Sequence, residues 1–190
     1  GTGLQGLVGS QLTNTLRNNY TFTNLSRSTG VDITDKEQIT RAVSTSSAAY
    51  VLHLAAKADV DGCERDKAHA EQGEAWRINV QGTRNIAEAC KASGKLLLYI
   101  STDFVFDGKK GNYAESDAPN AVNWYGKTKL EGENAIKDSG CAYVLLRIAY
   151  PYGQAFAGKK DFVQAILSRL QTGQEVAAVT DHIFTPTYIP

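Results

Sequence analysis

Apolar runs of strand length alternate with longer segments of helical period along most of this chain. The runs of strand length cover residues 20–25, 49–54, 95–101 and 143–148. Alternation of this kind is typical of βαβ units, because parallel strands need a crossover connection that a helix usually provides. The sequence therefore predicts an α/β fold with a doubly wound parallel sheet (a Rossmann fold), in one domain of residues 1–190.

Helical patterns occur between and after these runs, at residues 11–18, 34–43, 74–92, 124–138 and 162–170. Thr34-Asp35-Lys36-Glu37 fits a capping box and predicts the start of the second helix. Ser93-Gly94 is typical of a helix C-terminus and predicts the end of the third helix. Residues 57–73 form a polar stretch that follows the run at residues 49–54.

The two ends of the chain predict further structure beyond them. The sequence contains no Met, and it opens at Gly1-Thr2-Gly3 with no apolar strand before the glycines. It stops at Tyr188-Ile189-Pro190 without a polar tail. We therefore expect a first strand before residue 1 and a C-terminal substrate-binding part that begins near residues 150–190.

Composition narrows the classes of function. Lysine plus arginine and aspartate plus glutamate both number 20, so the net charge is zero and no nucleic-acid partner is indicated. No apolar stretch approaches the roughly 18 residues of a membrane-spanning helix, so no membrane partner is expected. Cys63, Cys90 and Cys141 match neither a metal site nor a disulfide framework. Reduced thiols of this kind indicate a cytoplasmic protein without a metal site.

Three glycines open the first predicted helix in the pattern Gly3-x-x-Gly6-x-x-Gly9. Such a loop lets backbone N–H groups approach a pyrophosphate and points the start of a helix at it. With no strand in front of it, the motif is equally compatible with a glycine-rich turn that binds nothing.

The run at residues 20–25 is followed by Ser-Arg-Ser instead of an acidic residue. In NAD-binding sheets an acidic residue at this place bonds the ribose hydroxyls, whereas an arginine can hold a 2′-phosphate through its forked donors. Arg27 and Ser28 therefore favour NADP(H), with NAD(H) and a merely solvated arginine left open. Asp32 and Ile33 are candidates to flank the adenine.

Tyr125 and Lys129 lie four residues apart and share one face of the predicted helix. A nearby cation favours the phenolate and lowers a tyrosine pKa, which suits acid–base catalysis. The pattern is common by chance and also fits an amphipathic helix with an exposed lysine. Thr102 follows the run at residues 95–101, at the end of a strand where α/β proteins bind ligands, and is a candidate to donate to a substrate carbonyl. A threonine there also fits an ordinary turn residue at a strand end.

These signals occur in one order, each at the carboxyl side of a predicted strand. With the string Ser-Thr-Asp-Phe-Val-Phe-Asp-Gly at residues 101–108, the chain resembles the extended short-chain dehydrogenase/reductases, and within them the dTDP-4-dehydrorhamnose reductase group. Matching stretches also occur at residues 54–61, 79–83 and 125–133. The resemblance runs along nearly the whole chain and ends in residues 185–188.

The resemblance implies roles for individual residues. Thr102, Tyr125 and Lys129 would form the catalytic trio. The glycine loop would cover the pyrophosphate, residues 55–57 would line the adenosine side, and Asn79 would support the active-site geometry. The full set expected at the cofactor is Gly3, Gly6, Leu7, Val8, Gly9, Arg27, Ser28, Asp32, Ile33, Leu54, Ala55, Ala56, Lys57, Asn79, Ser101, Tyr125, Lys129 and Ile148.

The reaction implied by the resemblance is reduction of the 4-keto group of a nucleotide-linked deoxy sugar by NADPH. Tyr125 would protonate the developing alkoxide, Lys129 would lower the tyrosine pKa and bond the nicotinamide ribose, and Thr102 would hold the carbonyl oxygen. The expected partner is thus a nucleotide sugar, and a homodimer is left open. Lys57 and residues 146–153 depart from the usual pattern of the group.

Two other functions stay open. A sugar-nucleotide epimerase or dehydratase would share the fold and use NAD, but Arg27 disfavours it. A non-catalytic NADP-binding subunit, resembling the regulatory subunit of methionine adenosyltransferase, would share the string at residues 101–108. An intact Tyr125 and Lys129 pair does not exclude that subunit, because a fold and a bound cofactor do not prove turnover.

Overall fold

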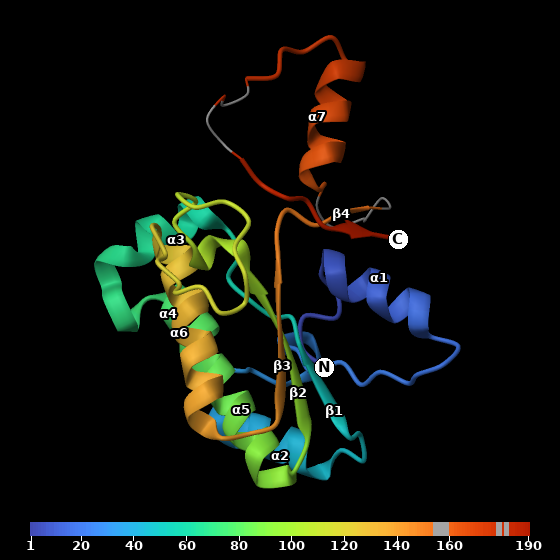
Figure 1. Ribbon diagram of the computed structural model, residues 1–190. Helices are drawn as coiled ribbons and strands as arrows, with labels where there is room; N and C mark the ends of the chain where they lie inside the picture. The colour runs from blue at the N-terminus through green and yellow to red at the C-terminus, as the bar shows by residue number, and fades with distance from the viewer. Residues whose placement is uncertain (154–159, 178–179, 181–182) are drawn as a thin grey trace.

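The computed structural model describes residues 1–153, 160–177, 180 and 183–190. Its centre is a parallel sheet in the order β1 (Tyr50–His53), β2 (Leu96–Thr102) and β3 (Tyr143–Ile148) (Figure 1). The helices that connect and cover these strands are α1 (Leu7–Leu16), α2 (Lys36–Thr45), α3 (Val60–Asp66), α4 (Glu74–Trp76), α5 (Thr83–Ser93) and α6 (Trp124–Ser139). The expected α/β fold with a parallel sheet is confirmed.

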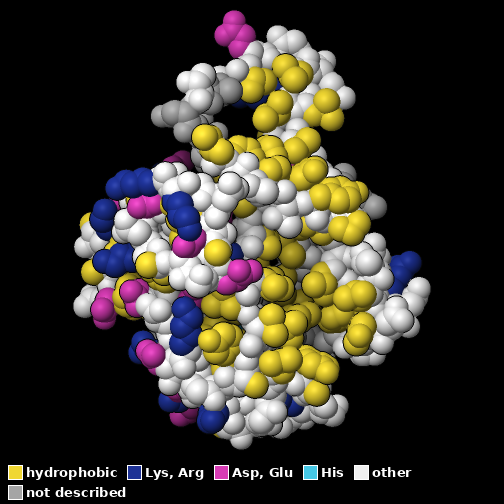
Figure 2. Space-filling model, viewed as in Figure 1, with side chains coloured by type: hydrophobic (Ala, Val, Ile, Leu, Met, Phe, Trp, Pro, Cys, Tyr) yellow, Lys and Arg dark blue, Asp and Glu magenta, His cyan; other side chains and the backbone are white. Residues whose placement is uncertain are grey.

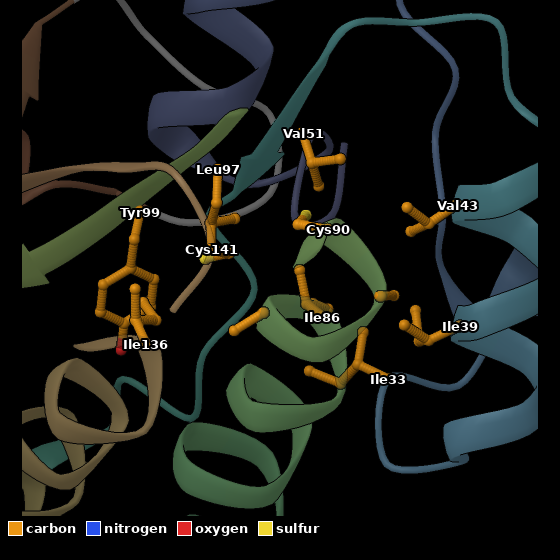
Figure 3. Packing of buried hydrophobic residues seen from close by; sticks show 12 residues of the cluster. Ile33, Ile39, Val43, Val51, Ile86, Cys90, Leu97, Tyr99, Ile136 and Cys141 are labelled. Carbon is orange, nitrogen blue, oxygen red and sulfur yellow. The ribbon is translucent and has the colours of Figure 1, made fainter. Parts of the chain in front are cut away.

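The two faces of the sheet are covered differently. On β2, Leu97 and Tyr99 are fully buried and pack with Ile86 of α5 and Ile136 of α6 (Figure 3). Leu98 faces the other way and borders a cavity that α1 also lines, and α1 lies on the opposite side of the strands from α5 and α6 (Figure 1). The core therefore lies between the strands and the layer formed by α2, α5 and α6.

Hydrophobic side chains remain exposed on the less covered face, where yellow atoms gather around the strands in Figure 2. They include Tyr50 of β1 and Val144 and Leu146 of β3, each more than a third exposed. No described helix is both long and apolar enough to cross a lipid bilayer.

Local signals position α6 and α5 as expected. The Asn123 side chain accepts a hydrogen bond from Gly126 N and begins α6, and Gly140 ends it in the left-handed conformation. Gly94 ends α5 in the same way. The segment expected as one helix over residues 74–92 is helical throughout, but it contains a π-helical stretch, η3 (Arg77–Gly82), between α4 and α5.

The polar stretch at residues 57–73 contains α3 and the short helix η2 (Lys67–Gln72). Two local expectations are wrong. Residues 20–25 do not form a strand among the described residues, where only Leu25 has a bridge partner, Thr2, which also bridges His53. The cap of α2 is Asp35, whose carboxylate accepts from the backbone and side chain of Gln38, and not the Thr34–Glu37 box.

The C-terminal region stands apart from the main sheet (Figure 1). Two short parallel strands, β4 (Tyr152–Gly153) and β5 (Tyr188–Ile189), lie beside helix α7 (Phe162–Gln171). Outside this region, two short 3-10 helices follow Ser26 and β2: η1 (Arg27–Thr29) and η4 (Asp103–Val105). Tyr150 packs against Phe162 and Phe184, with ring centroids 5.6 and 4.2 Å away. Aromatic contacts thus connect α7 to the end of β3.

Candidate active site

The glycine loop passes very close to the end of β1. Gly3 has a φ of +68°, and a Cβ there would lie 2.5 Å from Ala55 N, so both the conformation and the space require glycine. A Cβ at Gly9 would overlap the backbone of Gly3 and Leu4. The first turn of α1 can therefore sit directly against the loop.

The start of α1 is not capped by any side chain. Gly6 is its N-cap residue, and it is extended and exposed. The first N–H groups of a helix have no partner within the helix, and the helix dipole is positive there. The backbone of Leu7, Val8 and Gly9 thus offers the donors that an anionic group such as a pyrophosphate needs.

A cavity of about 460 Å³ opens beside this loop. Half of the residues expected at the cofactor line it, and the structure thereby joins the glycine loop, the segment after residue 25 and the end of β1 in one site. These expected residues are Gly3, Gly6, Arg27, Ser28, Asp32, Ile33, Leu54, Ala55 and Ala56. Sequence reasoning missed five further lining residues, Gln5, Leu25, Ser26, Val31 and Ile78.

Position next to a motif could have indicated most of the missed residues. Gln5 lies inside the glycine loop, and Leu25 and Ser26 directly precede Arg27. Ile78 carried no signal, since it comes from the π-helical stretch far along the sequence. Only the tertiary structure brings it to the cavity.

Arg27 and Asp32 form an ion pair on the wall of this cavity. Arg27 Nε donates to Asp32 Oδ2 at 3.0 Å, and the arginine side chain is 67% exposed. Hydrogen bonds from Thr34, followed by the charge of Arg27, hold the pKa of the Asp32 carboxyl below its usual value. Because the ion pair uses Nε, the N–H donors of the two terminal guanidinium nitrogens remain for a ligand.

Asn79 is buried and ties the segment after β1 to α6. Its Oδ1 accepts from Lys57 N at 2.8 Å, and its Nδ2 donates to Lys57 O at 3.1 Å and to Thr128 Oγ1 at 2.9 Å. The Lys57 side chain instead extends to Glu74, with 2.6 Å between Nζ and Oε2. Neither Lys57 nor Asn79 lines the cavity; both support the segment that does.

Thr102 and Tyr125 meet where β2 ends and α6 begins. Burial raises the pKa of Tyr125 to about 12, and the neighbouring Thr102 side chain opposes this shift only in part. The Tyr125 ring packs edge-on against Phe104, with centroids 5.6 Å apart. The expected lowering of the tyrosine pKa is therefore wrong for this structure, because burial outweighs every favourable neighbour.

Lys129 lies one turn further along the same face of α6, and it is only 2% exposed. Its Nζ donates to Ile100 O at 2.8 Å and lies 4.1 Å from the centre of the Tyr99 ring. Burial lowers the pKa of this amine to about 7, against an opposing influence of the Glu133 carboxylate. The ammonium thus points at β2 and can exchange a proton near neutral pH.

The structure does not bring Ser101 or Ile148 to the cavity. Ser101 is buried and donates its hydroxyl proton to Glu133 Oε1 at 2.6 Å, because alternation along β2 turns it toward α6. Ile148 is half-buried and pairs with Thr102 across the sheet. Among the residues that the structure describes, no cluster of His, Cys, Asp and Glu is arranged to hold a metal ion.

Comparison with known proteins gives matches over the whole chain. The family model of the RmlD substrate binding domain matches residues 1–190. The chain is 30% identical to the dTDP-4-dehydrorhamnose reductase of Aggregatibacter actinomycetemcomitans, over 98% of this chain and 62% of that protein. It is also 34% identical to methionine adenosyltransferase 2 subunit beta of Danio rerio, over 83% of this chain and 47% of that protein.

A similar solved structure is that of dTDP-4-dehydrorhamnose reductase from Bacillus anthracis in complex with NADP. It has a TM-score of 0.89 and 32% sequence identity, and the match covers 99% of this chain and 64% of that one. The chain thus spans less than two thirds of each of these three proteins.

Proposed function

Because the chain belongs to the RmlD substrate binding domain family, we propose that it reduces the 4-keto group of a nucleotide-linked deoxy sugar with NADPH. The observation that carries this proposal is the arrangement at the carboxyl ends of β1 and β2. One cavity joins the glycine loop, Arg27 and the residues that follow β1, and Thr102 at the end of β2 is a neighbour of Tyr125. The similarity to two dTDP-4-dehydrorhamnose reductases supports this substrate class.

The residues present fit NADP(H), with NAD(H) as a weaker alternative. Gly3 and Gly9 keep the backbone open beside the uncapped start of α1, where a pyrophosphate would be held. The terminal nitrogens of Arg27, with the Ser28 hydroxyl, would hold a 2′-phosphate. When bound, the cofactor supplies the hydride, and the solved relative in complex with NADP supports this assignment.

Side chains of this chain would supply the proton that the reduced sugar takes up. A tyrosine with a pKa of about 12 keeps its proton at neutral pH, so Tyr125 would donate it to the more strongly basic alkoxide that forms on the sugar. Thr102 would orient the carbonyl oxygen through its hydroxyl. Lys129, whose pKa is about 7, would bond the ribose side of the site and return a proton to Tyr125.

The sugar would bind at the C-terminal side of β2 and β3. We propose that residues 150–190 begin the substrate-binding region, because the aromatic contacts of Tyr150 carry the chain from β3 to α7. We also propose that the protein acts in the cytoplasm, since its three cysteines are buried free thiols.

The direct test is NADPH consumption by the purified protein with dTDP-4-dehydrorhamnose, with NADH compared under the same conditions. We expect turnover that prefers NADPH, with one molecule of reduced sugar formed for each NADPH consumed. Tight NADPH binding with no reduction of any nucleotide-linked 4-keto sugar would contradict the proposal.

A second candidate is a non-catalytic NADP-binding subunit, and the 34% identity to methionine adenosyltransferase 2 subunit beta favours it. It would bind NADPH but leave keto sugars unchanged. Stable co-elution with a methionine adenosyltransferase catalytic subunit, together with absent sugar reduction, would decide for this function.

A further inference from the structure

One carboxylate beside the proposed site is completely buried. Glu133 of α6 is 0% exposed, and both of its oxygens are engaged. Oε1 accepts from Ser101 Oγ at 2.6 Å and from Arg147 Nε at 2.9 Å, while Oε2 accepts from Arg147 Nη2 at 2.6 Å. Lys137 lies on the outer side, with Nζ 3.7 Å from Oε2. A buried charge persists only when it is paired in this way.

This cluster joins the three elements that carry the proposed site. Ser101 of β2 and Arg147 of β3 are partners in the sheet register, and Ser101 directly precedes Thr102. The Arg147 guanidinium also lies over the ring of Phe106, 4.9 Å from its centre. Phe106 belongs to the loop that follows Thr102. Glu133 therefore fixes α6 against the strand ends at the place where Thr102 and Tyr125 must meet.

Glu133 also follows Lys129 by one helical turn, so both side chains face β2. The ionisable side chains that interact with Lys129 are Glu133 of α6, His53 of β1 and Tyr99 of β2. Cys63 of α3 and Asp103 of η4 act on the neighbouring Tyr125. Burial keeps His53 and Tyr99 neutral near pH 7, because it lowers the pKa of His53 to about 3 and raises that of Tyr99. Glu133 is the anion that acts on Lys129.

We propose that Glu133 is a positioning residue whose buried carboxylate, fixed by Arg147 and Ser101, aligns Lys129 with β2 and balances its positive charge. The part that concerns catalysis rests on the proposed function. The arrangement has a simple physical basis: burial favours the neutral amine of Lys129, and a fixed anion one turn away favours the ammonium. Glu133 touches neither substrate nor cofactor in this assignment.

The test follows the titration of Lys129 in protein labelled with ¹³C-lysine, with Lys129→Met used to assign its signal. Glu133→Gln keeps the shape and removes the charge. Because this leaves Arg147 unpaired, the double variant Glu133→Gln/Arg147→Met replaces the whole pair by neutral groups and protects the fold. Glu133→Asp restores the charge, and Glu131→Gln is the matched control on the same helix.

We expect the midpoint of the Lys129 titration to fall by about one pH unit or more in Glu133→Gln. The fall should be smaller but of the same sign in the double variant, because the cationic Arg147 is removed too. Glu133→Asp should recover most of the wild-type value, and Glu131→Gln should match the wild type. In the pH profile of kcat, the pH at which kcat declines on the alkaline side should also be lower in Glu133→Gln.

An unchanged Lys129 titration in both Glu133→Gln and the double variant would overturn the inference. The NMR measurement needs no substrate, so it separates this inference from the proposed function. A titration shift in a protein that reduces no keto sugar would count against the reductase and leave the positioning role of Glu133 standing.

Discussion

Arg27 donates to Asp32 at 3.0 Å, and both side chains line the cavity beside the glycine loop. From the sequence, Arg27 was expected to bind a 2′-phosphate and Asp32 to flank the adenine. In the structure Asp32 instead holds the arginine side chain in place from its Nε edge. The guanidinium is thus oriented in advance, which reduces the entropy lost when it binds a ligand.

Replacing Arg27 by alanine should therefore weaken NADPH binding much more than NADH binding. A hydrogen bond to a charged group contributes about 1.5–3 kcal/mol, so the Kd for NADPH should rise about tenfold or more. Titration of cofactor fluorescence measures both affinities. Lys36→Met, which removes a cation paired with Glu88 outside the cavity, should leave both unchanged. An equal loss for NADPH and NADH would contradict a 2′-phosphate contact.

Replacing Tyr125 by phenylalanine should cut kcat by about 10²–10⁴-fold, the usual effect of losing an acid–base group. The affinity for NADPH should stay close to that of the wild type, because only the hydroxyl is removed. Steady-state reduction of the keto sugar and cofactor titration give the two values. Tyr143→Phe is the control, since that tyrosine is exposed on β3. Undiminished turnover in Tyr125→Phe would exclude the proposed proton donor.

Asn79→Ala should destabilise the protein by about 2–4 kcal/mol, because it leaves the N–H of Lys57 without its partner and removes two further hydrogen bonds, to Lys57 O and to Thr128 Oγ1. The midpoint of urea unfolding should fall accordingly. Asn134→Ala, on α6, removes only a 3.4 Å side-chain hydrogen bond and should change stability little. Since residues 55–56 line the cavity, weaker NADPH binding should accompany the loss in Asn79→Ala. Equal stability of the two variants would argue against the tie between Asn79 and Lys57.

The buried His53 should make stability depend on pH on the acid side. Its ring bonds Thr2 and Thr83, and burial lowers its pKa from 6.5 to about 3. Between these values the unfolded chain binds the extra proton, so stability is complete above about pH 6.5 and falls as the pH drops toward 3. Unfolding measured at several pH values should show a shallower dependence in His53→Gln. The exposed His69→Gln should keep the wild-type slope.

The elements near the site differ in how well local sequence predicted them. The resemblance to the reductase group and the α/β fold are confirmed, and β3 occupies the residues expected. Asn123 and Gly140 bound α6 through interactions that span only a few residues, so the sequence around them is sufficient. Tyr125 and Lys129 share a face of that helix for the same reason.

Residues whose environment depends on distant segments were predicted less well. The segment at residues 20–25 has β-forming residues, yet among the described residues only Leu25 is paired, in one parallel bridge with Thr2. The spacing of Tyr125 and Lys129 predicted a lowered tyrosine pKa, but burial raises it. Ser101 was expected at the cofactor and instead bonds Glu133.

By itself, the sequence determined the periodic elements, their caps and the glycines that the loop requires, because these depend on contacts between residues close along the chain. The tertiary structure decided which charges pair and which polar groups are buried: Arg27 with Asp32, Asn79 with Lys57, and Glu133 with Arg147. Pairing of this kind depends on which residues, far apart in the sequence, are buried next to each other in the fold. No local sequence pattern specifies that proximity.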